Sequence, residues 1–185
     1  MTLSLTITDS LLCLSALWAA IRARQAMGQR LAFGLISLAS LLGVLRFSGA
    51  YPLPAWHDLF TIWGGSAALP LLALSVRWPA SRVAAHQHEA WLFLLTAMAA
   101  GLLLAGLARF RLYDQALGTL AMLTLAWTFW QARAWLGLVG VGLMLGGSVL
   151  FLLRLQVLGL VPGDWLHLGL ALGLQGVSLA ARPRA

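Results

Sequence analysis

Apolar runs close to twenty residues long recur along the whole chain and restrict its fold more than any other feature. A helix that crosses the hydrocarbon core of a bilayer needs about 20 apolar residues. Seven such runs, bounded by Arg, Pro, Gly or Trp, lie at 3–21, 31–48, 58–76, 90–108, 115–131, 134–153 and 164–181. We therefore expect an all-α polytopic membrane protein, in which residues 1–185 form one seven-helix transmembrane domain without a soluble domain.

The composition agrees with a membrane location and excludes several functions. Hydrophobic residues make up 61% of the chain and charged residues 9%, which is unlike a soluble protein. The net charge of +7 suggests nucleic acid, but the basic residues are scattered in ones and twos at the ends of apolar runs. We expect membrane lipids as partners and no nucleic acid. All twelve basic residues are Arg, which excludes a retinal protein with a Lys Schiff base.

The distribution of arginine predicts the orientation of the spans. If the runs alternate in direction, eight arginines fall on one side of the membrane and four on the other. The richer side should face the cytoplasm, so we expect the N-terminus outside and the C-terminus inside. The cytoplasmic group is Arg22, Arg24, Arg30, Arg77, Arg82, Arg133, Arg182 and Arg184, and the external group is Arg46, Arg109, Arg111 and Arg154.

The five carboxylates all lie near predicted starts of helices, at Asp9, Asp58, Glu89, Asp114 and Asp164. Helix N-termini favour acidic side chains through capping and the helix dipole, each placement contributing about 0.3–1 kcal/mol. This structural interpretation accounts for nearly every charge, and it predicts that all of them except Glu89 share the external face. For Asp9 two interpretations stay open, because it either caps the first helix or lies almost two turns inside it.

Two histidine–carboxylate pairs remain after this structural account. His57 precedes Asp58 at the start of the third run, and His167 follows Asp164 by one helical turn at the start of the seventh. Two histidines and a carboxylate suit zinc with one position open for water, so we predict His57 and His167 as metal ligands. One or two of Asp9, Asp58 and Asp164 would complete the set, and we choose Asp164. The alternatives are a haem held by the two histidines, or histidines that only hydrogen-bond to helix caps.

Two further features concern packing and charge pairing. Gly142 and Gly146 in the sixth run have the spacing that permits close approach of two helices. Arg46, at the end of the second run, has three candidate partners, which are Asp9, Asp58 and the phosphate of an anionic lipid.

Four short motifs carry a resemblance to known membrane enzymes. Thr8-Asp9, the segment from Gly43 to Gly49, His57-Asp58 and Asp164-Trp165-Leu166-His167 resemble a small bacterial seven-span family, whose plan is similar to the CREST superfamily that includes alkaline ceramidases. Those enzymes hold zinc with one histidine near the end of the second span and two at the start of the seventh, and hydrolyse amides in lipids. The resemblance implies a bacterial inner membrane as the location.

The resemblance also implies site residues, with departures at two of the three zinc histidines. His167 matches the last histidine of the seventh span, whereas Gly163 stands where the other would fall. Near the end of the second span Arg46 and Ser48 take the place of a histidine, so His57 would be the substitute ligand. Catalytic roles are then implied for Asp9, Ser48 and Asp58.

Three functions are consistent with these features. The first is a CREST-like, zinc-dependent hydrolase of lipid amides or esters, or another lipid-modifying protein, with its site near the external face. The second is a non-catalytic subunit or scaffold that packs against other membrane subunits. The third is a haem-binding electron carrier.

Overall fold

The computed structural model describes residues 3–23, 26–51, 54–108, 110 and 112–181, and nearly all of them are helical. Apart from a single bridge between Val157 and Leu160, the described residues form no β structure. The elements are α1 (Leu3–Arg22), α2 (Met27–Ser48), α3 (Pro54–Trp63), η1 (Gly64–Ala68), α4 (Leu69–Arg77), α5 (Arg82–Ala85), α6 (Gln87–Gly101), η2 (Leu102–Leu107), α7 (Leu112–Gln131), α8 (Trp135–Leu152) and α9 (Pro162–Ala180). The all-α prediction is confirmed.

Five helical stretches within the described residues are long and apolar enough to cross a membrane: Leu3–Arg22, Met27–Ser48, Pro54–Arg77, Gln87–Leu107 and Trp135–Leu152. The outer surface of the bundle also carries many exposed leucines and tryptophans, as a lipid-facing surface does. The protein is therefore a polytopic membrane helical bundle. The two remaining apolar runs, 115–131 and 164–181, fall in α7 and α9.

Segments α3, η1 and α4 form one continuous rod that passes a proline without breaking. Pro70 has no N–H group to donate to a carbonyl in the preceding turn. The backbone N–H of Leu69 donates to the carbonyl of Gly64, five residues earlier, so the chain widens into a π-helical turn there. This local shift lets the rod continue through Pro70 to Arg77.

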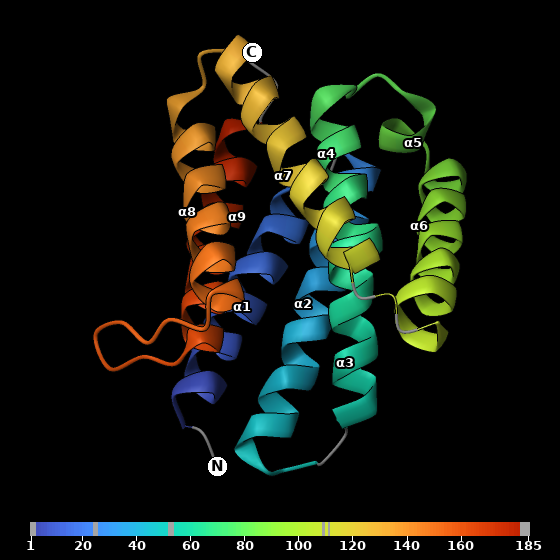
Figure 1. The fold of residues 1–185 in the computed structure, drawn as a ribbon. Helices are drawn as coiled ribbons and strands as arrows, with labels where there is room; N and C mark the ends of the chain where they lie inside the picture. Colours follow the sequence, from blue (N-terminus) through green and yellow to red (C-terminus); the bar gives the residue numbers. More distant parts are fainter. Residues whose placement is uncertain (1–2, 24–25, 52–53, 109, 111, 182–185) are drawn as a thin grey trace.

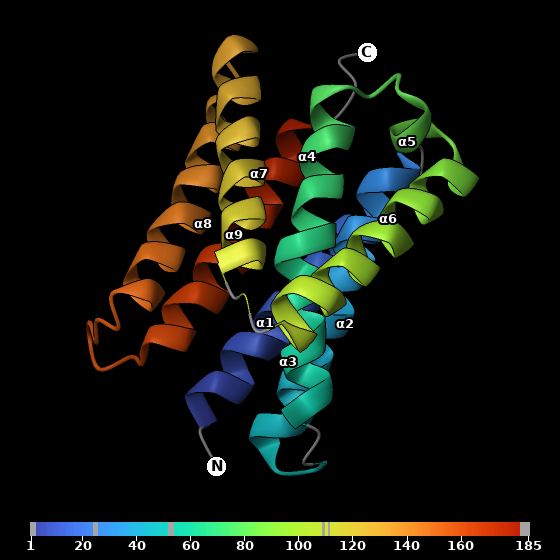
Figure 2. The same ribbon diagram turned by 45° about the vertical axis from the view of Figure 1, so that its right-hand side comes forward.

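The first and last helices lie side by side and close the bundle. In Figure 1, α1 packs between α2 and α9, and α8 and α9 form a hairpin along one side. At the opposite edge α6 packs against η1 and α5, and Figure 2 shows that it is strongly inclined to the other long helices. The buried core lies between these edges and contains Phe33, Leu71, Leu125 and Met144.

Polar side chains join α1 to α9 inside the bundle. The Ser15 hydroxyl donates to the carbonyl of Ala171 at 2.6 Å, and the Gln175 amide donates to the carbonyl of Ser15 at 2.7 Å. Such bonds bring two helices into a fixed register in an environment without water. Gln175 therefore forms an interhelical hydrogen bond.

Close packing of α8 on α9 depends on glycines, but not on the pair that the sequence suggested. A Cβ at Gly140 would lie 2.6 Å from the carbonyl oxygen of Gly173, and one at Gly147 would lie 2.5 Å from that of Trp165. No described atom outside the local helix backbone lies within 4 Å of a Cβ built at Gly142 or Gly146. The predicted contact through Gly142 and Gly146 is therefore wrong, because these residues lie on the outer face of α8.

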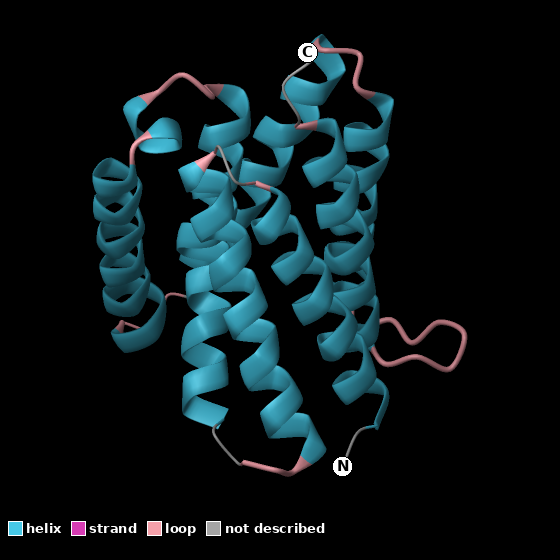
Figure 3. Ribbon diagram, turned by 180° about the vertical axis from the view of Figure 1, so that it is seen from behind, coloured by secondary structure: helices cyan, strands magenta, loops and turns pink. Residues whose placement is uncertain are grey.

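The connections separate into two ends of the bundle. The N-terminus, the α2–α3 connection and the long α8–α9 loop lie at one end, and the C-terminus, α5 and the α7–α8 turn lie at the other (Figure 3). Among the described arginines, Arg46 and Arg154 belong to the first end and Arg22, Arg30, Arg77, Arg82 and Arg133 to the second. The other arginines of the orientation argument, Arg24, Arg109, Arg111, Arg182 and Arg184, lie outside the described residues.

The α8–α9 contact makes a first prediction. Gly140→Ala should destabilise the bundle, because the added methyl meets backbone that cannot move aside, and overpacking of this kind costs about 1–3 kcal/mol. Gly142→Ala on the outer face of the same helix is the matched control and should leave the melting temperature unchanged or slightly higher. Thermal unfolding in detergent measures both, and equal melting temperatures would contradict this helix contact.

Candidate functional site

A cavity of about 490 Å³ lies inside the bundle near the end that holds the N-terminus. It is walled by residues of α1, α2, α3, η1, α7, α8 and α9, and most of its lining is apolar. Its polar lining includes Asp9, His57, Asp58, Thr61, Asp114, Gln115, Ser148 and His167. Residues that are far apart in the sequence thus meet in one space.

The cavity exists because α7 begins deep in the bundle rather than at its end. The carbonyl oxygen of Asp114, in the first turn of α7, would lie 2.8 Å from a Cβ at Gly65, which is near the middle of the rod Pro54–Arg77. Between that turn and the end that holds the N-terminus, no helix of the described residues lies between α3 and the α8–α9 hairpin (Figure 1). Asp114 therefore does not share the external face with Asp9, Asp58 and Asp164, and that part of the prediction is wrong.

Asp9 lies inside α1 rather than at its start. It is six residues beyond Leu3, about 9 Å along the helix at 1.5 Å per residue, and only 1% of it is exposed. Its Oδ1 atom lies 3.5 Å from Nδ1 of His167 on α9. Of the two interpretations of Asp9, the deep one is the one observed.

The Asp9 carboxylate is tightly packed, and one of its oxygens lacks a hydrogen bond. Its Oδ2 atom is buried and has no hydrogen-bond partner among the described residues. It rests against the backbone of Gly43 on α2, where any Cβ would collide with the carboxylate. A buried carboxylate oxygen without a partner is costly, and such groups in membrane spans usually serve a function.

His167 is oriented by two side chains of α1. Its Nδ1 atom faces Asp9 Oδ1 and also lies 3.4 Å from the Thr8 hydroxyl. With Nδ1 engaged on that side, Nε2 is the ring nitrogen left for a ligand in the cavity that His167 lines. A carboxylate beside the opposite nitrogen fixes the orientation of the ring.

Asp164 has a structural role that occupies both of its oxygens. Its Oδ2 atom accepts a hydrogen bond from the backbone N–H of Val161 at 3.1 Å, which caps α9. Its Oδ1 atom accepts one from the Thr8 hydroxyl at 3.1 Å, and the residue is fully buried. Asp164 therefore fixes α9 against α1 and, through Thr8, supports the placement of His167.

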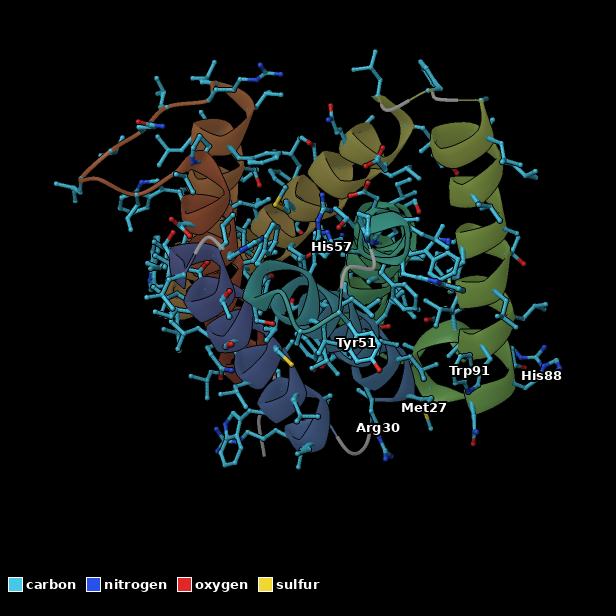
Figure 4. The ribbon with its side chains drawn as sticks, turned by 90° about the horizontal axis from the view of Figure 1, so that it is seen from below. Met27, Arg30, Tyr51, His57, His88 and Trp91 are labelled. Atoms are coloured by element: carbon cyan, nitrogen blue, oxygen red, sulfur yellow. The ribbon has the colours of Figure 1, made fainter. Side chains whose placement is uncertain are left out.

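His57 and Asp58 belong to a separate cluster around Arg46. The Arg46 guanidinium donates to Asp58 Oδ1 at 2.8 Å and to His57 Nδ1 at 3.0 Å, so the partner of Arg46 is Asp58 and not Asp9. Figure 4, which views the bundle from the end that holds the N-terminus, shows His57 near the middle of the bundle. His57 thus reaches the same cavity as His167 from the opposite wall.

The Ser48 hydroxyl is engaged at the end of α2. It donates to the carbonyl of Leu45 and accepts from the backbone N–H of Ala50, each at 3.3 Å. The site residues that sequence reasoning missed are Thr8 as a bridge between Asp164 and His167, and Gly43 as the floor beneath Asp9. Both residues belong to the short motifs that carry the resemblance, but the motifs gave no role to either, because a threonine or a glycine inside an apolar run is common in any membrane helix.

The predicted zinc ligands do not fit a zinc ion in this arrangement. No group of three or more His, Cys, Asp or Glu side chains suited to a metal ion occurs within the described ranges. Both oxygens of Asp164 are engaged, and the cationic Arg46 lies against His57 and would repel a metal ion there.

Comparison with known proteins adds no relative: the chain matches no family model, no curated protein and no solved structure. The likeness to the CREST superfamily stays a prediction from short motifs.

The different roles of Asp164 and Asp58 lead to a second prediction. Asp164→Ala should lower the free energy of unfolding by about 1–2 kcal/mol, because it removes a helix cap and the hydrogen bond from Thr8 that joins α1 to α9. Asp58→Ala removes an ion pair whose Asp58 side chain is 52% exposed, and should cost under about 1 kcal/mol. Unfolding of both variants in the same detergent is the measurement. A larger loss for Asp58→Ala would contradict the structural role given to Asp164.

Proposed function

We propose that this protein crosses the cytoplasmic membrane of a bacterium seven times, with its N-terminus outside. Five described stretches meet the length and apolarity of a membrane span, and α7 and α9 supply two more helices of similar length. The arginine-rich end of the bundle would face the cytoplasm. The cavity then opens toward the external half of the membrane.

Within that topology the protein binds an amphiphilic molecule in the cavity and modifies its polar head. The observation that carries this proposal is the contact between Asp9 and His167 on the wall of a largely apolar cavity. An apolar tail suits the cavity walls, and a polar head suits the histidine and carboxylate groups. This assignment is closest to the lipid-modifying activity implied by the motif resemblance, but it uses no zinc.

The side chains support acid–base chemistry at the head group. His167 Nε2 accepts a proton from water while the water oxygen attacks the carbonyl carbon of an ester or amide, and Asp9 stabilises the imidazolium that forms. The same proton then passes to the departing oxygen or nitrogen as its bond to carbon breaks. Thr8 and Asp164 are positioning residues, because they hold the α1–α9 contact that sets the His167 ring.

A non-catalytic membrane subunit is the second candidate function. Asp58 forms an ion pair with Arg46 and Asp164 caps α9, so two of the six predicted catalytic or metal-binding residues have structural roles. Under this alternative Asp9 and His167 would only join two helices. Gentle solubilisation that yields a stoichiometric membrane partner, with no turnover of lipids, would favour it.

A third prediction separates the enzyme from the subunit. Purified protein in lipid nanodiscs should release the fluorescent acyl chain of an amide lipid or its matched ester. His167→Ala should reduce that rate about 100-fold or more, because general acid–base catalysis contributes about 10²–10⁴-fold. His88→Ala in the exposed start of α6 is the matched control and should keep the full rate. Absence of turnover, or equal rates in both variants, would refute the enzymatic proposal.

Metal analysis and an absorption spectrum of the same preparation distinguish the remaining chemistries. We expect the rate to be unchanged by a chelator, since Arg46 opposes a cation at His57. One zinc per chain that is lost in His167→Ala would instead restore the predicted zinc site. A Soret band would support the haem carrier.

A further inference from the structure

A second hollow lies on the lipid-facing side of the bundle, away from the cavity described above. It is a groove of about 820 Å³ between α1 and α2 on one side and α6 on the other. Its walls are almost wholly apolar, and Arg30 is the charged residue among the described residues that line it. The groove exists because α6 is inclined to its neighbours and stands at the edge of the bundle (Figure 2).

The groove has a polar end and an apolar end. Arg30 is in the first turn of α2 and Trp91 is in the second turn of α6, so both mark the end that is rich in arginine. Leu38, Phe60 and Met98 line the other end, deeper in the bundle. In Figure 4, Arg30 and Trp91 appear on the same side of the bundle, on neighbouring helices.

The length of the groove matches one leaflet of a bilayer. Arg30 and Leu38 are eight residues apart on α2, which is about 12 Å of helix. Half of the hydrocarbon core is about 15 Å thick. A single acyl chain can therefore run along the groove while its head group stays at the level of Arg30.

Arg30 is available for an external anion. Arg30 is exposed, and it forms no ion pair in the described part of the chain. The neighbouring cations have partners, since Arg82 pairs with Glu89 at 2.6 Å and Arg77 donates to Gln131 at 2.8 Å. A guanidinium binds a phosphate through two parallel hydrogen bonds, and the cytoplasmic leaflet is rich in anionic lipids.

We propose that this groove binds an anionic phospholipid, whose phosphate contacts Arg30 and one acyl chain of which lies between α2 and α6. Gly34 forms part of the floor, and a Cβ built there has no described atom within 4 Å outside the local helix backbone. That open space is filled by the acyl chain. Arg30 lies at the opposite end of the bundle from Asp9 and His167, although Phe60 lines both the groove and the cavity. The lipid site does not depend on the activity proposed for the cavity.

The first test removes the charge. Native mass spectrometry of detergent-solubilised protein titrated with dioleoyl phosphatidylglycerol should detect one lipid bound more tightly than dioleoyl phosphatidylcholine. Arg30→Gln should weaken phosphatidylglycerol binding about tenfold, the loss expected for a charge-assisted hydrogen bond to phosphate. Arg22→Gln is the matched control at the same end, where Arg22 stacks on Trp18 outside the groove, and it should bind as the wild type does.

The second test fills the groove. Gly34→Leu should abolish the tight phosphatidylglycerol site, because its side chain occupies the space of the acyl chain without a clash with the protein. Gly142→Leu, on an equally open face of α8, should leave both the melting temperature and lipid binding unchanged. Equal binding of the two lipids, or tight binding retained in Arg30→Gln and Gly34→Leu, would overturn the proposal. So would a dimer that is lost in Gly34→Leu while no lipid is bound.

Discussion

The hydrogen bonds between α1 and α9 are the interactions on which the rest of this bundle depends. Inside a membrane a polar side chain without a partner is costly, so Thr8, Ser15, Asp164 and Gln175 can be accommodated only if the first and last helices meet in one register. That register brings Asp9 next to His167. Glycine contacts between α8 and α9 then add α8 to the same unit.

The candidate site follows from this closure and from the depth at which α7 begins. The first turn of α7 packs at Gly65, so the space beneath it stays open between α3 and the α8–α9 hairpin. The closed α1–α9 pair presents Asp9 and His167 to that space, while Arg46 holds His57 on the opposite wall. A bundle with seven equally deep helices would have filled it.

The sequence predicted where the helices lie along the chain, but not which side of each helix contacts its neighbours. Apolar runs mark each helix because a span must be apolar along its whole length, whichever way it is rotated. The rotation of α8 about its axis places Gly140, and not Gly142, against α9. The positions at which α1 and α7 begin along the bundle decide that Asp9 is buried and that Asp114 lies near the middle of the bundle. Both depend on contacts with helices distant in the chain. His57 and His167 line one cavity, because the alternation of the helices brings the starts of α3 and α9 to one end of the bundle.

Impermeant maleimide labelling of single cysteines tests the central claim, that the chain brings the starts of α3 and α9 to one face of the membrane. With Cys13 replaced by Ser, cysteines at Ala50, Leu158 and Ala80 would report on the α2–α3 connection, the α8–α9 loop and the α4–α5 turn. We predict that intact cells label positions 50 and 158 from outside, and position 80 only after lysis. Labelling of 50 and 158 from opposite sides would contradict the shared cavity and the site built on it.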